Sequence, residues 1–161
     1  MNIYHISYSL DHYGTREVTL SFHGCNFECI GCLRKRSKYD IYADKEERID
    51  MSLEGIIQKV NELKPHRVYF GGYEPTLDPD LISIIKTLSR ADRYLCLCTN
   101  GSKLDEDYVK ELRRAGINQV FLSVKAFDSG KHIYYTKVSN ELSLRAISLL
   151  SKMEDEHFML H

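Results

Sequence analysis

The sequence predicts an α/β fold in which a parallel sheet carries helices on its outer face. Short apolar, β-branched segments alternate along the chain with amphipathic segments of helical period. Strands separated by helices in this way form βαβ units, whose strands run parallel. No internal repeat, low-complexity tract or Gly/Ser-rich linker divides the 161 residues. Because about 150 residues is an ordinary domain size, we expect one domain over residues 1–161.

The first strand–helix–strand unit is expected over residues 18–70. Residues 18–22 alternate β-branched and apolar side chains with polar ones, which predicts a strand. Apolar residues recur at helical spacing over residues 53–63, and Pro65 ends this helix. The short apolar segment 67–70 is the second strand. It leads directly into a pair of glycines.

The next unit runs to the third strand. Asp78 followed by Pro79 has the pattern of an N-cap and a first-turn proline. The helix that they begin has its buried face over residues 81–88. Residues 94–98 are apolar and predict a strand, which the turn signal Asn100-Gly101 ends.

Two further units complete the expected elements. A helix over residues 104–115 ends at Gly116, and a fourth strand covers residues 119–124. Ser139 or Asn140 caps a helix that runs through Lys152. Residues 157–161 have the pattern of a fifth strand. No turn or polar tail follows it, so we expect a barrel shortened at its carboxyl end or a chain cut there.

The composition excludes several classes of protein. Hydrophobic residues make up 43% and charged residues 28%, which is ordinary globular usage and not that of a disordered chain. A net charge of −1 gives no general attraction to nucleic acid or to an anionic membrane. Apolar runs are too short to span a membrane, and the first residues lack a signal-peptide pattern. We therefore expect a cytoplasmic protein.

Three of the five cysteines lie within eight residues, directly after the first strand. Cys25, Cys29 and Cys32 are spaced C-x3-C-x2-C. Three thiolates can hold three irons of a [4Fe–4S] cluster and leave the fourth iron without a protein ligand. An open metal position is what a reactive site needs. The alternative is a structural zinc site with His23 as fourth ligand, while Cys96 and Cys98 are expected to be small buried side chains on a central strand.

Three short motifs follow later strands. They are Gly71-Gly72-Tyr73-Glu74-Pro75, Thr99-Asn100-Gly101 and Ser123-Val124-Lys125. In parallel sheets, ligands bind outside the carboxyl ends of the strands, which is where all three motifs are expected. Glycines allow close backbone approach to a ligand, and charged side chains pair with groups of opposite charge.

Together these motifs resemble the radical S-adenosylmethionine (SAM) superfamily. The triplet is similar to its cluster signature, and the segment from Asp11 to Arg16 resembles one that precedes the cluster loop in glycyl-radical-enzyme activating enzymes. The resemblance extends from Asp11 to the end of the chain. It implies a partial (βα) barrel, a [4Fe–4S] cluster and SAM. The implied SAM-binding residues are Gly71, Gly72, Glu74, Thr99, Asn100, Ser123 and Lys125, beside the cluster ligands Cys25, Cys29 and Cys32.

The sequence departs from this family at three places. Tyr73 is inserted before Glu74, the residue that the resemblance assigns to the SAM amino group. Gly31 stands where the family often has an aromatic residue near adenine, and Phe27 either fills that space or packs under the loop. The acidic residues around a monovalent cation in some activating enzymes are replaced by Cys98 and Ser123, so the sequence leaves open whether a cation site exists.

The resemblance implies reductive cleavage of SAM to a 5′-deoxyadenosyl radical that abstracts hydrogen, with a protein glycine as the expected substrate. The expected partners are this protein substrate and a flavodoxin- or ferredoxin-like electron donor, with no nucleic acid and no membrane. The alternatives are a radical SAM synthase acting on a purine-like small molecule, and a non-catalytic iron–sulfur module for electron transfer or sensing.

Two segments near the expected site have open roles. The basic run 34–38 is either a solvated loop or a docking patch for an acidic partner. His132, Tyr134 and Tyr135 are expected in a loop after the fourth strand, where they either contact substrate or pack against the protein.

Overall fold

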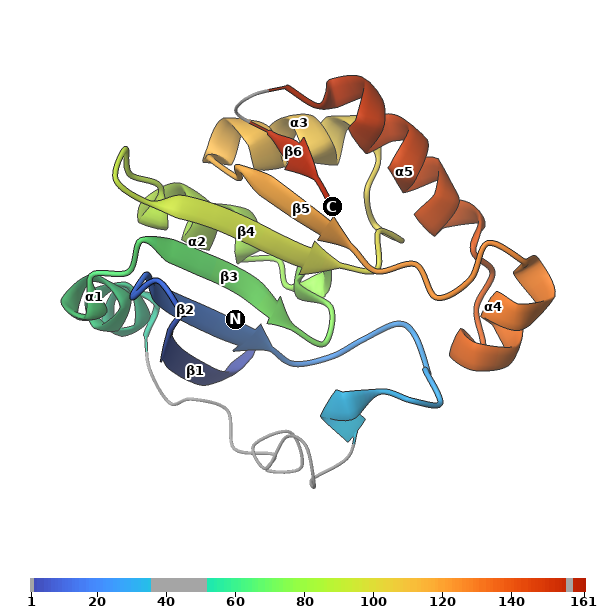
Figure 1. Cartoon of the computed structure of the whole chain (residues 1–161), viewed down its shortest axis with the longest axis horizontal. Helices are drawn as coiled ribbons and strands as arrows, with labels where there is room; N and C mark the ends of the chain where they lie inside the picture. The colour runs from blue at the N-terminus through green and yellow to red at the C-terminus, as the bar shows by residue number, and fades with distance from the viewer. Residues whose placement is uncertain (1, 36–51, 156–157) are drawn as a thin grey trace.

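The protein is a six-stranded sheet with helices, seen in a computed structural model that describes residues 2–35, 52–155 and 158–161 (Figure 1). The strands are β1 (Ile3–Leu10), β2 (Arg16–Phe22), β3 (Arg67–Gly72), β4 (Tyr94–Thr99), β5 (Gln119–Leu122) and β6 (Met159–Leu160). The helices are α1 (Leu53–Leu63), α2 (Leu81–Leu88), α3 (Glu106–Ala115), α4 (Ser129–Thr136) and α5 (Glu141–Met153). The sheet order is β1-β2-β3-β4-β5-β6.

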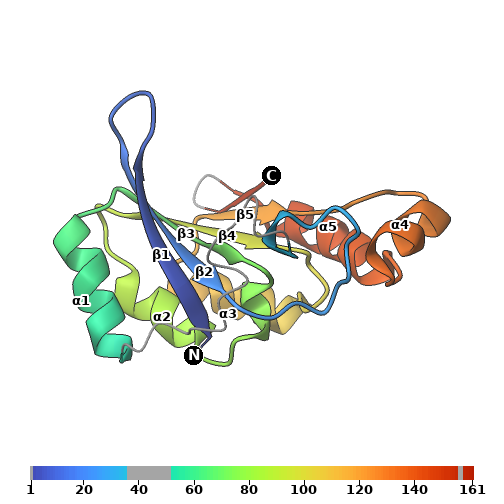
Figure 2. The ribbon, with the colours of Figure 1, turned by 90° about the horizontal axis from the view of Figure 1, so that it is seen from below.

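The pairing of the strands confirms the predicted α/β fold. β1 pairs with β2 antiparallel, and each later pair of neighbours is parallel. Figure 2 shows α1, α2 and α3 on the same face of the sheet. Alternate strand residues such as Phe70 and Leu97 are fully buried there, in one core with Ile84 and Leu112 of the helices. Because β1 and β6 are not paired with each other, the sheet is an open, partial barrel.

The parallel strands place the predicted motifs at one edge of the sheet. β2, β3, β4 and β5 all end on the same side, and the loop after β2 and helix α4 lie beyond that edge (Figure 1). This arrangement follows from the parallel pairing, since strands that run in one direction have their carboxyl ends together.

Two elements were not predicted. β1 forms a hairpin with β2, and the Asp11 side chain closes its turn by accepting hydrogen bonds at 2.8 Å from the backbone N–H groups of Tyr13 and Thr15. The prediction of a loop around residues 132–135 is wrong, because these residues lie in α4. Asp128 caps that helix by accepting a hydrogen bond from the Lys131 N–H at 2.7 Å.

Several boundaries also differ from the expectation. Asp80, and not Asp78, is at the N-cap of α2, because the Asp78 carboxylate is turned to the backbone N–H groups of Asn2 and Asp80. α3 begins after the cap Asp105, and β5 ends at residue 122. Of the basic run, residues 34 and 35 form part of a short 3-10 turn, while residues 36–38 lie outside the described part of the chain, as does residue 157. No helix in the described residues is long and apolar enough to cross a bilayer.

Candidate functional site

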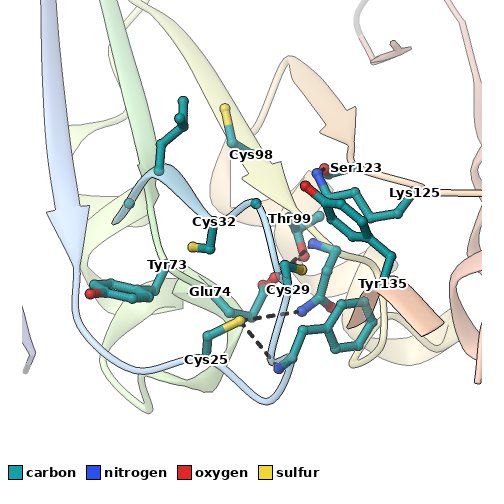
Figure 3. A pocket seen from close by; sticks show the side chains of 15 residues that line it. Cys25, Cys29, Cys32, Tyr73, Glu74, Cys98, Thr99, Ser123, Lys125 and Tyr135 are labelled. Atoms are coloured by element: carbon teal, nitrogen blue, oxygen red, sulfur yellow. Dashed lines mark hydrogen bonds between the residues drawn. The ribbon is translucent and has the colours of Figure 1, made fainter. Parts of the chain in front are cut away.

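A pocket of about 380 Å³ opens at the carboxyl edge of the sheet (Figure 3). This volume lies within the range of ordinary small-molecule sites. Nine of the ten predicted site residues line it. They are Cys25, Cys29, Cys32, Gly72, Glu74, Thr99, Asn100, Ser123 and Lys125. The tenth, Gly71, is buried and is not among the lining residues.

The cysteine loop, residues 23–32, is fixed to the end of β3 by backbone hydrogen bonds. The Tyr73 N–H donates to the Phe22 carbonyl at 3.0 Å, and the Glu74 N–H donates to the Gly24 carbonyl at 2.9 Å. The inserted Tyr73 stacks its ring on His23, with ring centroids 5.4 Å apart and planes 8° from parallel. The insertion therefore extends the contact between β3 and the start of the cysteine loop.

Helix α4 holds the other end of the cysteine loop. The N–H groups of Glu28 and Ile30 donate to the carbonyls of Thr136 and Tyr135, each at 2.9 Å. Between these bonds, Phe27 is 2% exposed and meets the buried ring of His132 edge-on. Phe27 thus packs under the loop, and the unpredicted helix is a support for the cysteines.

A chain of amides joins the cysteine loop to the end of β4. Asn100 Nδ2 donates to Asn26 Oδ1 at 2.9 Å, and Asn26 Nδ2 donates to Ser102 Oγ at 2.8 Å. The Ser102 N–H returns a bond to Asn100 Oδ1 at 2.9 Å. Asn100 Nδ2 also lies 4.0 Å from the Cys25 sulfur. Because each member has a defined partner, the amides fix Cys25 relative to the sheet.

Glu74 ties the ends of β3 and β4 together. Its carboxylate is 1% exposed and accepts four hydrogen bonds, from the N–H and hydroxyl of Thr76, the hydroxyl of Thr99 and the N–H of Asn100. Burial raises the pKa of Glu74, and these hydrogen bonds oppose the rise. A carboxylate with these hydrogen bonds holds the two strand ends together, and the expected role of Glu74 as a ligand of the SAM amino group stays a prediction.

The three thiols of the cysteine loop face one pocket but do not form a site for a single ion. Within residues 2–35, 52–155 and 158–161, no group of three or more His, Cys, Asp or Glu side chains is arranged to hold one metal ion. Structural zinc requires its ligands within about 2.0–2.3 Å of one ion. The zinc alternative therefore has no support from this geometry, with His23 stacked on Tyr73. A cluster of several irons is larger, so its thiolates stand further apart.

Two thiols of the cysteine loop, those of Cys25 and Cys29, are made weaker acids by their surroundings. Burial is the main cause that raises the pKa of Cys25 and of Cys29, and the Lys125 ammonium partly lowers that of Cys29. Iron binds the thiolate, so loading must release these protons.

We expect iron loading to increase with pH. Both pKa values lie above the ordinary value of a cysteine thiol, so the thiolate fraction of each thiol rises about tenfold per pH unit between roughly pH 6.5 and 8.5. Anaerobic reconstitution followed by visible absorbance measures the rate of loading at each pH. A rate that is the same across this range would show that deprotonation of the thiols does not limit loading.

The other two cysteines differ from each other. Cys96 is fully buried, as predicted, and burial raises its pKa to about 12. The prediction that Cys98 is a buried core side chain is wrong, because Cys98 lines the pocket and is only partly buried. Burial raises the pKa of Cys98 to about 11, so it is a thiol at neutral pH. The feature of the sequence that could have placed Cys98 at the pocket is its position, directly before the Thr99-Asn100-Gly101 motif.

A lysine directly after β5 supplies positive charge to the pocket. The Lys125 ammonium donates a hydrogen bond to the Ser123 hydroxyl, and the side chains of both residues are exposed at the pocket (Figure 3). The Ser123 N–H donates to the Thr99 carbonyl at 2.8 Å, which continues the pairing of β4 and β5 beyond the strand. This bond fixes the start of the segment that carries Lys125.

Comparison with known proteins places this site in a family. Residues 19–156 match the Radical SAM superfamily. The chain is 34% identical over 157 residues to a protein of Methanocaldococcus jannaschii whose name gives it provisionally as a glycyl-radical enzyme activating enzyme. It is 30% identical over 107 residues to a GTP 3′,8-cyclase of Mannheimia succiniciproducens.

The solved structure of native anSMEcpe with bound AdoMet has the same fold, with a TM-score of 0.60 and 25% identity. The present chain matches over 86% of its own length and covers 40% of that structure. It aligns over 97% of its length with the M. jannaschii protein, covering 55% of it, and over 65% with the cyclase, covering 31%.

Members of this family are enzymes that bind a [4Fe–4S] cluster and SAM, and the anSMEcpe structure holds AdoMet. The three-cysteine loop and the strand-end motifs surround one pocket, and the family match runs from β2 through β3, β4 and β5 to the end of α5. On this match, the chain belongs to the radical SAM superfamily.

Proposed function

We propose that this protein binds a [4Fe–4S] cluster through Cys25, Cys29 and Cys32, binds SAM beside it, and cleaves SAM reductively to begin hydrogen abstraction. The observation that carries the proposal is the convergence of three thiols, a lysine ammonium and exposed strand ends on one pocket. When bound, the cluster supplies the electron that cleaves SAM to methionine and a 5′-deoxyadenosyl radical.

Different residues bind the cluster and the different parts of SAM. The three cysteines hold three irons and leave the fourth without a protein ligand. Lys125, with Ser123 beside it, pairs with the SAM carboxylate, because an ammonium and a carboxylate form a charge-assisted hydrogen bond. Gly72 presents backbone at the pocket, while Glu74 positions the strand-end turn. Gly71, which is buried, supports the strand end without lining the pocket.

Lys125→Gln is expected to weaken SAM binding about tenfold and to leave the iron content unchanged. A hydrogen bond to a charged group contributes about 1.5–3 kcal/mol, and exposure of Lys125 places the effect near the lower end. Calorimetry on the reconstituted protein measures the SAM Kd. Lys131→Gln is the matched control, since Lys131 is exposed on α4 and does not line the pocket. Equal Kd values for the two variants would remove Lys125 from the site.

The substrate that we propose is a glycine of a partner protein. The M. jannaschii relative supports this choice through its name, and it aligns with 97% of the chain. The cyclase relative supports the small-molecule alternative with a purine nucleotide, over a shorter alignment. The proposed electron donor is a flavodoxin- or ferredoxin-like protein, and the proposed location is an anaerobic cytoplasm, because the radical must be kept from oxygen. We propose that residues 1–161 form one domain.

The release of 5′-deoxyadenosine tests the proposed function. The protein is reconstituted anaerobically with iron and sulfide, reduced with dithionite and given SAM, and the products are separated by chromatography. Release without substrate supports the enzyme. A brown protein that binds but never cleaves SAM would indicate an electron-transfer or sensing module, and a colourless protein with bound zinc would contradict the cluster. Faster release with GTP, and not with a partner protein, would favour the small-molecule alternative.

A further inference from the structure

One wall of the pocket is aromatic and comes from α4. Tyr135 lies in the last turn of that helix and lines the pocket together with the cysteine loop. In Figure 3 its ring is drawn beside Ser123 and Lys125, and its hydroxyl approaches Gly31, the residue before Cys32. The Tyr135 backbone is fixed to the loop, because its carbonyl accepts the bond from the Ile30 N–H at 2.9 Å.

Gly31 leaves room for this side chain. A Cβ added at residue 31 would lie 2.2 Å from the Tyr135 hydroxyl oxygen and 3.2 Å from Cζ of the ring. The backbone of Gly31 is outside the left-handed region, so its conformation does not demand glycine. The requirement is one of space. Gly31 and Tyr135 therefore form a steric pair, in which the absence of one side chain accommodates the other.

Within the described part of the chain, Tyr135 is the aromatic side chain that lines the pocket without packing against another aromatic ring. Phe27 is buried against His132, and Tyr73 stacks on His23 and donates its hydroxyl to the Arg34 carbonyl at 2.7 Å. Among the described residues, the Tyr135 ring has no aromatic partner and its hydroxyl has no hydrogen bond. Its ring and hydroxyl are therefore free to contact a ligand.

We propose that Tyr135 is the surface on which the adenine ring of SAM packs, and that Gly31 is glycine because α4 supplies this aromatic contact. The inference rests on the proposed function, since it assigns a residue to the SAM of that site. A purine ring is planar and favours offset stacking or edge contact with an aromatic ring, and the tyrosine hydroxyl adds a hydrogen-bonding group for the ring nitrogens. Tyr135 thus selects for the base, while Lys125 selects for the amino-acid end.

Substitutions at Tyr135 test the contact. Tyr135→Leu is expected to raise the SAM Kd of the reconstituted protein about three- to tenfold, the range of an aromatic pair, while Tyr135→Phe stays within about twofold. Iron content should be unchanged in both. An unchanged Kd in Tyr135→Leu would overturn the inference, as would a loss of iron, which would show that Tyr135 only supports the loop.

A double-mutant cycle that combines Tyr135→Leu with Lys125→Gln tests whether the two residues contact different ends of SAM. If Tyr135 and Lys125 contact different parts of one ligand, the two fold-changes in Kd multiply. A Lys125→Gln effect that disappears in the Tyr135→Leu background would overturn the inference, because it would mean that Tyr135 acts by holding Lys125 in place. If the unsubstituted protein bound no SAM at all, that result would contradict the proposed function itself and not only the role of Tyr135.

A second test places the aromatic ring at residue 31 and removes it from residue 135. Gly31→Phe should lose iron or SAM affinity, because the new side chain meets Tyr135. Gly31→Phe combined with Tyr135→Ala removes that clash and restores an aromatic ring from the loop side. The combined variant is expected to bind SAM at least about threefold more tightly than Gly31→Phe. No recovery, or an unaffected Gly31→Phe variant, would contradict the steric pairing of the two residues.

Discussion

Replacing Cys29 with alanine is expected to abolish the iron–sulfur cluster. The proposed cluster has only three protein thiolates, and the remaining pair would hold about four irons poorly. Iron per chain after anaerobic reconstitution should fall from about four to near zero, with loss of the brown colour. The apo-protein should keep its fold, because Cys29 is on a loop at the pocket and is not part of the core.

Cys98→Ala is the matched control for Cys29→Ala. Cys98 lines the same pocket, but burial raises its pKa to about 11 and it is expected to remain a thiol. This variant should retain full iron content. Equal loss of iron in the two variants would show that Cys98 is a cluster ligand and that no iron is left open for SAM.

Gly72→Ala is expected to destabilise the protein by at least about 3 kcal/mol. Gly72 has φ +96°, and a Cβ there would lie 2.7 Å from the Phe22 nitrogen and 2.8 Å from the Phe22 carbonyl oxygen. These are backbone atoms of the neighbouring strand, paired in register with Gly72, so they cannot move without opening the β2–β3 ladder. The cysteine loop begins directly after that point, and we expect iron loading to be impaired as well.

Gly14→Ala separates conformational strain from steric overlap. Gly14 has φ +79°, but no atom lies within 4 Å of an added Cβ. Gly14→Ala should therefore lower the free energy of unfolding only by the strain of a positive φ, about 1 kcal/mol. Denaturant unfolding of the two apo-variants gives both free energies. Equal destabilisation would mean that the close approach of Gly72 to β2 does not matter.

The sequence was sufficient to predict the parallel core. The strands with β-branched and apolar residues, and the helices with apolar residues at helical spacing, depend on local pattern and were found. Because parallel strands end at one edge, the motifs after β3, β4 and β5 could be expected to meet near Cys25, Cys29 and Cys32. Nine of ten predicted residues line one pocket for this reason.

The parts that could not be predicted depend on contacts between distant segments. β1 alternates polar and apolar residues, but only its pairing with β2 makes it a strand. α4 has a mixed composition and is stabilised by its cap and by the cysteine loop that it supports. Glu74 holds two strand ends together through hydrogen-bond donors that lie 2 and 25–26 residues away in the sequence. The reason for a glycine at residue 31 is its contact with Tyr135, more than one hundred residues later.

The most direct test of the whole account is the electron paramagnetic resonance spectrum of the reduced, reconstituted protein before and after SAM is added. Three cysteine ligands and one open iron predict a spectrum that shifts when SAM binds, at about four irons per chain. A spectrum that saturating SAM leaves unchanged, with full iron content, would show a cluster with no open position and would contradict the account.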